Sequence, residues 1–198
     1  MNEGTTMGLL KTYCDYVKDR SDENGLLHKA YHDTQYGFPL ADDNELLGRL
    51  ILEINQAGLN WTMILKKQEH FRKAYDNFDV ERIAAYTERD IDRLLADAGI
   101  IRNRLKIRAA IRNAQVVRTL QQEHGSFRRW LDMQTCADLA EWTKLFKKTF
   151  TFTGGEIVNE FLMSTGYLPH AHAESCPVYA TILEHKPRWA ERLAARSA

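Results

Sequence analysis

One segment in the first third of the chain organises the rest: Leu50-Ile51-Leu52-Glu53-Ile54-Asn55-Gln56-Ala57-Gly58-Leu59-Asn60-Trp61. Leu50 and Ala57 are seven residues apart, which predicts that they share the buried face of an amphipathic helix. Glu53 falls on that same face, where a carboxylate is costly unless a specific partner stabilises it. A glycine then interrupts the helix, and Trp61 begins a second amphipathic run. The segment therefore predicts a helical corner where a carboxylate and an indole could form a small pocket.

Glu53 has a second interpretation at this level. Arg49 precedes it by four residues, so the two side chains could instead form an ordinary ion pair at the edge of the helix. The residues of the segment are compatible with both interpretations.

The composition limits the class of protein. The 198 residues, 44% of them hydrophobic, suffice for one generous domain or a domain with a smaller lobe. With only 11 Gly and 4 Pro, many short strands are disfavoured, and long segments of helical periodicity predict an all-α fold. No apolar segment is long enough to span a bilayer and residues 1–10 lack a signal pattern, so we expect a soluble, cytoplasmic protein. Three scattered Cys residues favour thiols or metal ligands over disulfides.

The charge is balanced overall but unevenly distributed. The 27 basic and 27 acidic residues give a net charge of zero, which by itself disfavours nucleic-acid binding. Residues 98–122, however, contain no acidic residue, and a local basic face matters more for phosphate binding than the overall sum. The basic residues of this stretch are Arg102, Arg104, Lys106, Arg108, Arg112 and Arg118. The alternative is an ordinary solvated helix face.

A helical hairpin is predicted at the start of this basic stretch, where Ala98-Gly99-Ile100-Ile101 joins two helices. We expect Gly99 to adopt a backbone conformation closed to other residues, which would allow a tight connection. The unpaired N–H groups at the start of the second helix suit a phosphate, and Arg102, Arg104 and Lys106 would add positive charge beside them. This arrangement is typical of contacts to the DNA backbone that do not depend on sequence.

Two irregular segments at opposite ends of the chain contain possible metal ligands. Cys14 and His32 lie in one, and His172 and Cys176 lie in the other. Together they have the composition of a closed tetrahedral zinc site, which would tie the two ends of the chain together. His170 is a competing ligand for His172, and scattered buried Cys with surface His is the other interpretation.

Several short segments, each uninformative alone, together form a pattern that identifies a family by their order along the chain. They are Ala30-Tyr31-His32-Asp33, Tyr36-Gly37-Phe38-Pro39, Leu52-Glu53, Gln56-Ala57-Gly58-Leu59-Asn60-Trp61, Ile64-Leu65-Lys66-Lys67, Asp97-Ala98-Gly99-Ile100-Ile101-Arg102-Asn103-Arg104, Lys106-Ile107, Thr143-Lys144, Phe152-Thr153-Gly154 and the final His172 to Cys176. In this order they resemble the DNA-3-methyladenine glycosylase I family of helix–hairpin–helix glycosylases. The resemblance extends from about Cys14 to Cys176, nearly the whole chain.

The resemblance implies an all-α helix–hairpin–helix glycosylase fold with a lobe, formed by the N- and C-terminal segments, that one structural Zn²⁺ ties together. It implies excision of 3-methyladenine from alkylated double-stranded DNA by cleavage of the N-glycosidic bond, leaving an abasic site. By position in the motifs, the catalytic pocket acid is Glu53, and the base-binding residues are Tyr16, Tyr31, Tyr36 and Trp61, with Tyr16 and Tyr36 standing where the family commonly has tryptophan. The implied zinc ligands are Cys14, His32, His172 and Cys176, and the residues toward the DNA backbone are Gly99, Ile101, Arg102, Arg104 and Lys106.

Physical chemistry agrees with this assignment. An enzyme that acts on a base must extrude it from the duplex into a pocket. An N3-methylated adenine is cationic, so aromatic faces attract it, and Glu53 can accept hydrogen bonds from its edge. Because the leaving group is already activated, selective binding can supply much of the catalysis without a lysine nucleophile. Four protein ligands leave zinc no open position, so the metal is expected to be structural.

The sequence departs from the family pattern in the pocket region. Small hydroxyl residues followed by an aromatic are usual after Gly154, and here stand Gly155, Glu156, Asn159 and Glu160. His28 stands where better-known members have tyrosine, and an insertion separates Cys14 from His32. Two alternatives follow: a DNA-lesion-binding protein with altered or lost excision activity, and a zinc hydrolase.

We expect a monomer with one glycosylase unit over residues 12–185. Its central helical-hairpin lobe should cover about 42–135, and its second lobe should combine 12–41 with 136–185. Residues 1–11 and 186–198 are expected to be loose ends.

Overall fold

The computed structural model describes residues 12–197, and over this range all regular structure is helical. This confirms the predicted all-α class. The elements are α1 (Tyr13–Lys18), α2 (Glu23–Thr34), α3 (Asp43–Gln56), α4 (Trp61–Ala74), the 3₁₀ turn η1 (Asp76–Phe78), α5 (Val80–Ala84), α6 (Glu88–Ala96), α7 (Arg104–His124), α8 (Phe127–Met133), α9 (Leu139–Thr149), α10 (Gly155–Ser164), α11 (Pro177–Glu184) and α12 (Arg188–Ser197).

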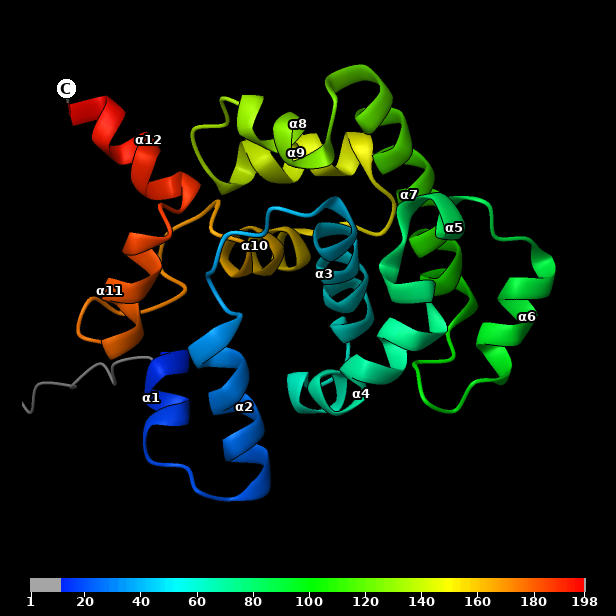
Figure 1. The fold of residues 1–198 in the computed structure, drawn as a ribbon, viewed down its shortest axis with the longest axis horizontal. Helices are drawn as coiled ribbons and strands as arrows, with labels where there is room; N and C mark the ends of the chain where they lie inside the picture. The colour runs from blue at the N-terminus through cyan, green and yellow to red at the C-terminus, as the bar shows by residue number, and fades with distance from the viewer. Residues whose placement is uncertain (1–11, 198) are drawn as a thin grey trace, which may run out of the picture.

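Helix α3 lies at the centre, with α4, α5, α7, α8 and α10 packed around it (Figure 1). Every residue of α3 from Leu46 to Asn55 is buried, so this helix has no exposed face over that stretch. The pattern of apolar residues predicts only one buried face. The other faces are covered because helices from distant parts of the sequence, α7 and α10 above all, pack on them.

The predicted corner after α3 is confirmed. Asp42 caps the start of α3 by accepting from the amides of Asn44 and Glu45, and the helix ends at Gln56. Gly58 has φ +79°, a conformation that favours glycine. Asn60 then accepts from Met63 N and caps α4, which begins at Trp61. The corner is therefore specified by local residues on both sides.

The hairpin, residues 97–103, connects α6 to α7 as predicted, but Gly99 is required for a different reason. Its φ is not in the left-handed region. A Cβ on Gly99 would instead lie 2.8 Å from His70 Cδ2, and Lys67 Nζ donates to Ala98 O at 2.8 Å. The hairpin thus lies close against α4, and the missing side chain allows this approach.

The prediction of a loose end at residues 186–198 is wrong for the described part of that segment. Residues 188–197 form α12, and Trp189 N donates to Gly166 O at 3.2 Å. Arg188 and Arg192 donate to the carbonyls of Asp132 and Gln134 at 3.0 and 2.7 Å. These partners are distant in sequence, so local pattern gives no sign of them.

Residues 1–11, the other predicted loose end, lie outside the described residues. Within residues 12–197, each helix is either too short or too polar to cross a lipid bilayer. The division into a central lobe and a terminal lobe stays a prediction.

Candidate functional site

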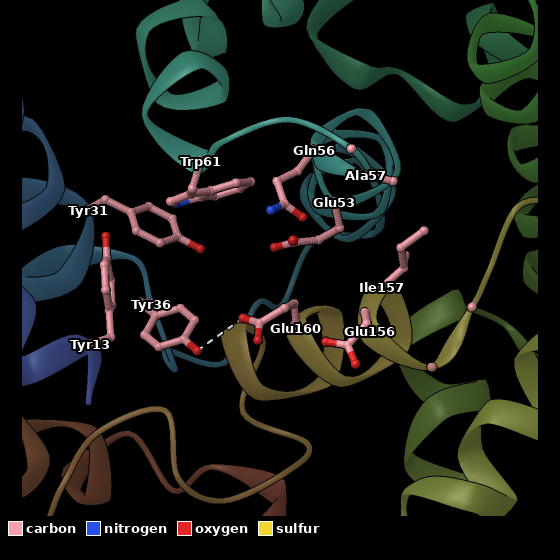
Figure 2. A pocket seen from close by; sticks show the side chains of 13 residues that line it. Tyr13, Tyr31, Tyr36, Glu53, Gln56, Ala57, Trp61, Glu156, Ile157 and Glu160 are labelled. Atoms are coloured by element: carbon pink, nitrogen blue, oxygen red, sulfur yellow. Dashed lines mark hydrogen bonds between the residues drawn. The ribbon is translucent and has the colours of Figure 1, made fainter. Parts of the chain in front are cut away.

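A cavity of about 650 Å³ opens beside the corner between α3 and α4, and we call it the main cavity (Figure 2). A volume of this size is typical of small-ligand sites. Helix α3 and the corner form one side, α10 forms the opposite side, and aromatic rings from α1, α2 and α4 close one end. The lining residues are Tyr13, Tyr31, Tyr36, Glu53, Gln56, Ala57, Gly58, Trp61, Gly154, Gly155, Glu156, Ile157 and Glu160.

Glu53 points from α3 into the main cavity (Figure 2). Its side chain is only 4% exposed, and within residues 12–197 it accepts no hydrogen bond. Burial raises the pKa of Glu53 to about 8; Arg49 lowers this pKa and the nearby Glu160 raises it further. The site therefore holds a buried carboxyl with unused acceptor capacity.

The interpretation of Glu53 as half of an ordinary ion pair with Arg49 at the edge of the helix is wrong. Arg49 is itself buried, and its Nη1 donates to Tyr31 Oη at 3.0 Å and to Ser164 O at 3.3 Å. Its guanidinium carbon lies 5.2 Å from the centre of the Tyr31 ring. Arg49 thus links α2 and α10 to α3 and fixes the ring that faces the cavity.

Three of the four predicted base-binding residues line the main cavity. Trp61 and Tyr31 lie 5.3 Å apart between ring centres, with 61° between their planes. Tyr36 is 5.7 Å from Tyr31. Burial raises the pKa of both tyrosines far above their ordinary value, so their hydroxyls stay protonated and can donate hydrogen bonds.

Tyr16, the fourth predicted residue, does not line the main cavity. Its ring is 38% exposed, and Tyr13 lies in the cavity wall instead, 5.2 Å from Tyr36. The two tyrosines are three residues apart on α1, and the short helix turns Tyr13 toward the cavity. His28 fixes Tyr13, because its Nδ1 lies 2.8 Å from the Tyr13 hydroxyl and its Nε2 lies 2.8 Å from Thr62 Oγ1.

Glu156 and Glu160 line the cavity from α10, opposite Glu53 (Figure 2). Tyr36 donates from its hydroxyl to Glu160 Oε2 at 3.2 Å. The sequence marks both glutamates as departures from a family pattern but gives no distance to Glu53. Gln56 also lines the cavity without having been singled out, although it follows Glu53 by three residues on the same helix.

The structure brings together the four predicted metal ligands. The ligand atoms of Cys14, His32, His172 and Cys176 all lie within 4.8 Å of one another. Four separations between a cysteine sulfur and a histidine ring nitrogen run from 3.4 to 3.9 Å. A tetrahedral zinc separates such atoms by roughly 3.5 Å, given its usual bond lengths. This cluster, the Cys/His cluster, could therefore hold a metal ion.

The second ring nitrogen of each histidine also has a partner. His32 Nδ1 lies 2.7 Å from Asp33 Oδ1, and His172 Nε2 lies 2.8 Å from Tyr36 O. Such contacts orient the imidazoles of metal sites and fix which nitrogen faces the ion. Through Tyr36, the Cys/His cluster is joined to the wall of the main cavity.

Contrary to the expectation from the sequence, Lys106 does not add positive charge beside the first N–H groups of α7. It is 5% exposed, and its Nζ donates to Asn55 O at 2.9 Å and Ala57 O at 2.6 Å. These are carbonyls at the end of α3, where a cation complements the unpaired acceptors. Lys106 is therefore engaged in joining α7 to the corner, and it is not available to a phosphate.

The rest of the predicted basic face is partly neutralised. Arg104 pairs with Glu88 at 3.3 Å and with Asp92 at 3.1 Å, both from α6. Asn103 Oδ1 accepts from the amides of Leu105 and Lys106, so two of the expected free N–H groups are occupied. Within residues 12–197, the exposed Arg102 side chain and the amides of Ile101, Arg102 and Arg104 have no partner.

The chain is similar to known proteins over most of its length. The family model described as "Methyladenine glycosylase" matches residues 22–141. DNA-3-methyladenine glycosylase 1 of Escherichia coli (strain K12) is 34% identical over 172 residues, which cover 77% of this chain and 91% of that protein. DNA-3-methyladenine glycosylase of Haemophilus influenzae is 30% identical, covering 85% and 98%. The solved 3-methyladenine DNA glycosylase I from Staphylococcus aureus, described for its recognition of 3-methyladenine, has a TM-score of 0.71 and 32% identity, covering 82% and 94%.

Proposed function

We infer that this chain, which belongs to the methyladenine glycosylase family, is a DNA repair glycosylase that excises 3-methyladenine from alkylated DNA. The observation that carries the proposal is the buried Glu53, which faces aromatic rings across the main cavity and accepts no hydrogen bond from the described residues. Aromatic rings on which a base can stack, together with one hydrogen-bond acceptor, suit a base that has been flipped out of the duplex.

The cationic base would bind between the rings of the main cavity. Trp61, Tyr31, Tyr36 and Tyr13 offer aromatic faces to a positive charge. Glu53 would accept hydrogen bonds from the base edge, and the cation would offset the cost of ionising a buried carboxyl. The site is therefore more complementary to a charged alkylpurine than to an undamaged base. Tyr16, which is outside the cavity lining, is not part of this proposal.

The chemistry is hydrolysis of the N-glycosidic bond. The bond from C1′ to the base nitrogen breaks, the base leaves as a neutral purine, and a water oxygen bonds to C1′ with loss of a proton. The positive charge of the methylated base already weakens the bond, so holding the departing base tightly lowers the barrier. Of the described residues that line the cavity, none is a lysine, which supports a monofunctional enzyme that leaves an abasic site.

The hairpin would bind the DNA backbone in the helix–hairpin–helix manner. The amides of Ile101, Arg102 and Arg104, which have no partner among residues 12–197, and the exposed Arg102 side chain support this part of the proposal. Gly99 would contribute by letting the hairpin lie against α4. Lys106, which is buried, would contribute indirectly by fixing the corner between α3 and α4 to α7.

The Cys/His cluster would hold one structural Zn²⁺ through Cys14, His32, His172 and Cys176. The two-Cys, two-His donor set, the separations near those of a tetrahedral site and the partners of both imidazoles support zinc. The ion would supply no catalytic chemistry, since four protein ligands close the site. It would join α1 and α2 to the segment before α11. Cytoplasmic location and a monomeric state stay predictions.

The test is release of free base from DNA treated with a methylating agent. We expect the purified protein to release 3-methyladenine and to leave most 7-methylguanine in place, with chromatography identifying the bases. Glu53→Gln should slow this release by at least about tenfold, and Glu184→Gln, at an exposed position, should not.

Glu156 and Glu160, which depart from the family pattern, favour a second candidate, a protein that binds the lesion without excision. Retention of methylated duplex with no base released would support that candidate and contradict excision.

A metal test separates a structural ion from a catalytic one. A chelator should lower the melting temperature, and base release should fall only as the protein unfolds. Loss of turnover in a protein that is still folded would indicate a zinc hydrolase instead.

A further inference from the structure

A second carboxylate faces Glu53 across the main cavity. Glu160 comes from α10 and Glu53 from α3, and both point into the space between these helices (Figure 2). Glu160 is half-buried and is held by the hydroxyl of Tyr36 at 3.2 Å. Glu53, 4% exposed and without a hydrogen-bond partner within residues 12–197, marks the space between them as a ligand site.

The groups around the two carboxyls neutralise them only in part. Burial raises the pKa of Glu160, and the hydrogen bond from Tyr36 partly lowers it. One cation, Arg49, acts on Glu53, and that arginine is also bound to Tyr31 and Ser164. The groups that face the pair are Tyr13, Tyr31, Tyr36, Arg49, Glu156 and Asn159.

We propose that Glu160 is a specificity-determining residue, which makes the main cavity distinguish cationic alkylpurines from neutral purines of the same shape. The proposal rests on the proposed function, because it concerns the ligand of that same cavity. The aromatic rings and Glu53 already favour a positive charge, while the contacts that depend on shape are similar for both kinds of base. A second carboxylate, facing the base from the side opposite Glu53, adds a preference that depends on charge alone.

The test uses two small ligands that differ only in charge. The cation 3,9-dimethyladenine carries a methyl group where the sugar would be attached, and 3,9-dimethyl-3-deazaadenine is its neutral isostere. The measured quantity is the ratio of their dissociation constants. We expect Glu160→Gln to reduce this preference for the cation roughly tenfold, an order of magnitude expected for one nearby charge in a protein site.

Glu160→Gln is chosen because it changes the charge of the side chain with little change in its size. A glutamine can still accept from the Tyr36 hydroxyl, so the charge is removed while the hydrogen bond is kept. Glu184→Gln removes a charge from an exposed residue of α11 that is not part of the cavity lining, where solvent screens it, and should change the ratio less than about twofold. An unchanged ratio in Glu160→Gln, or an equal loss in Glu184→Gln, would overturn the proposal.

The pH dependence gives a second readout. In the wild-type protein the cation competes with protons for the carboxyl pair, so its affinity should rise with pH toward about 8, the folded pKa of Glu53. Removing the Glu160 charge lowers that pKa, so the rise in Glu160→Gln should end at lower pH. The same midpoint in both proteins would count against the proposal. If Glu160→Gln fails to fold, Glu160→Ser provides the same loss of charge.

A failure of the Glu160 proposal can be distinguished from a failure of the proposed glycosylase function. Base release from methylated DNA by the wild-type protein tests the glycosylase assignment by itself. If the wild-type protein releases base while Glu160→Gln and Glu160→Ser keep the full preference for the cation, only the role of Glu160 is refuted.

Discussion

Replacing Glu53 by glutamine should stabilise the free protein at high pH. Folding raises the pKa of Glu53 to about 8 from an ordinary 4.5, with burial as the main cause. The folded state therefore binds the proton more tightly than the unfolded state. The stability due to the neutral carboxyl is fully present below about pH 4.5, and it is lost as the pH rises through about 8.

The size of the effect follows from the two pKa values. Each unit is worth about 1.4 kcal/mol, so full ionisation of Glu53 costs about 5 kcal/mol of stability. Between pH 5.5 and 8.5, the accessible part of this range, the loss is about 3 kcal/mol. Glutamine cannot ionise, so the variant should gain that amount relative to wild type over the same interval.

The assay is urea unfolding of wild type and Glu53→Gln at several pH values and one fixed zinc concentration. The difference between their free energies of unfolding should grow by about 3 kcal/mol from pH 5.5 to 8.5. The exposed Glu184→Gln serves as the control and should give a constant difference. If the Glu53→Gln difference also stays constant to within about 0.5 kcal/mol, Glu53 is not held in a site that disfavours its charge, and the reasoning fails.

Three further predictions concern the hairpin and its supports. Lys106→Met leaves two carbonyls at the end of α3 without their donor, so it should cost about 3 kcal/mol in urea unfolding and slow base release; unchanged stability would show that the contact is dispensable. Gly99→Ala places a Cβ 2.8 Å from His70 and should cost about 1–3 kcal/mol, partly recovered when His70→Ala is added; no recovery would contradict the steric cause. Arg102→Gln should leave the melting temperature unchanged, weaken DNA binding and reduce the slope of log affinity against log salt by about 1; an unchanged slope would remove Arg102 from the DNA interface.

The parts of the fold that could be predicted are those specified locally. The corner from Glu53 to Trp61 depends on a helix stop, a glycine and a cap that are adjacent in sequence, and it is confirmed. The pairing of Cys14 and His32 with His172 and Cys176 needed the family resemblance, because no spacing rule connects ligands about 140 residues apart. The distinction between Tyr13 and Tyr16 was missed, since it depends on the rotation of a short helix against distant partners.

Lys106 and α12 were mispredicted for a similar reason. A basic residue in an acid-free run is most simply placed in solvent, yet the carbonyls left unpaired at the end of α3 bind Lys106 in the interior. Helix α12 is held by the carbonyls of Gly166, Asp132 and Gln134. In both cases the acceptors belong to segments far away in the sequence, and only the tertiary arrangement brings them near.

The most direct measurement is a crystal structure of the protein soaked with 3-methyladenine. The account predicts the purine in the main cavity, stacked against Trp61, with a Glu53 oxygen within hydrogen-bonding distance of the base edge. A base bound elsewhere, or a main cavity that stays empty at saturating 3-methyladenine, would contradict it.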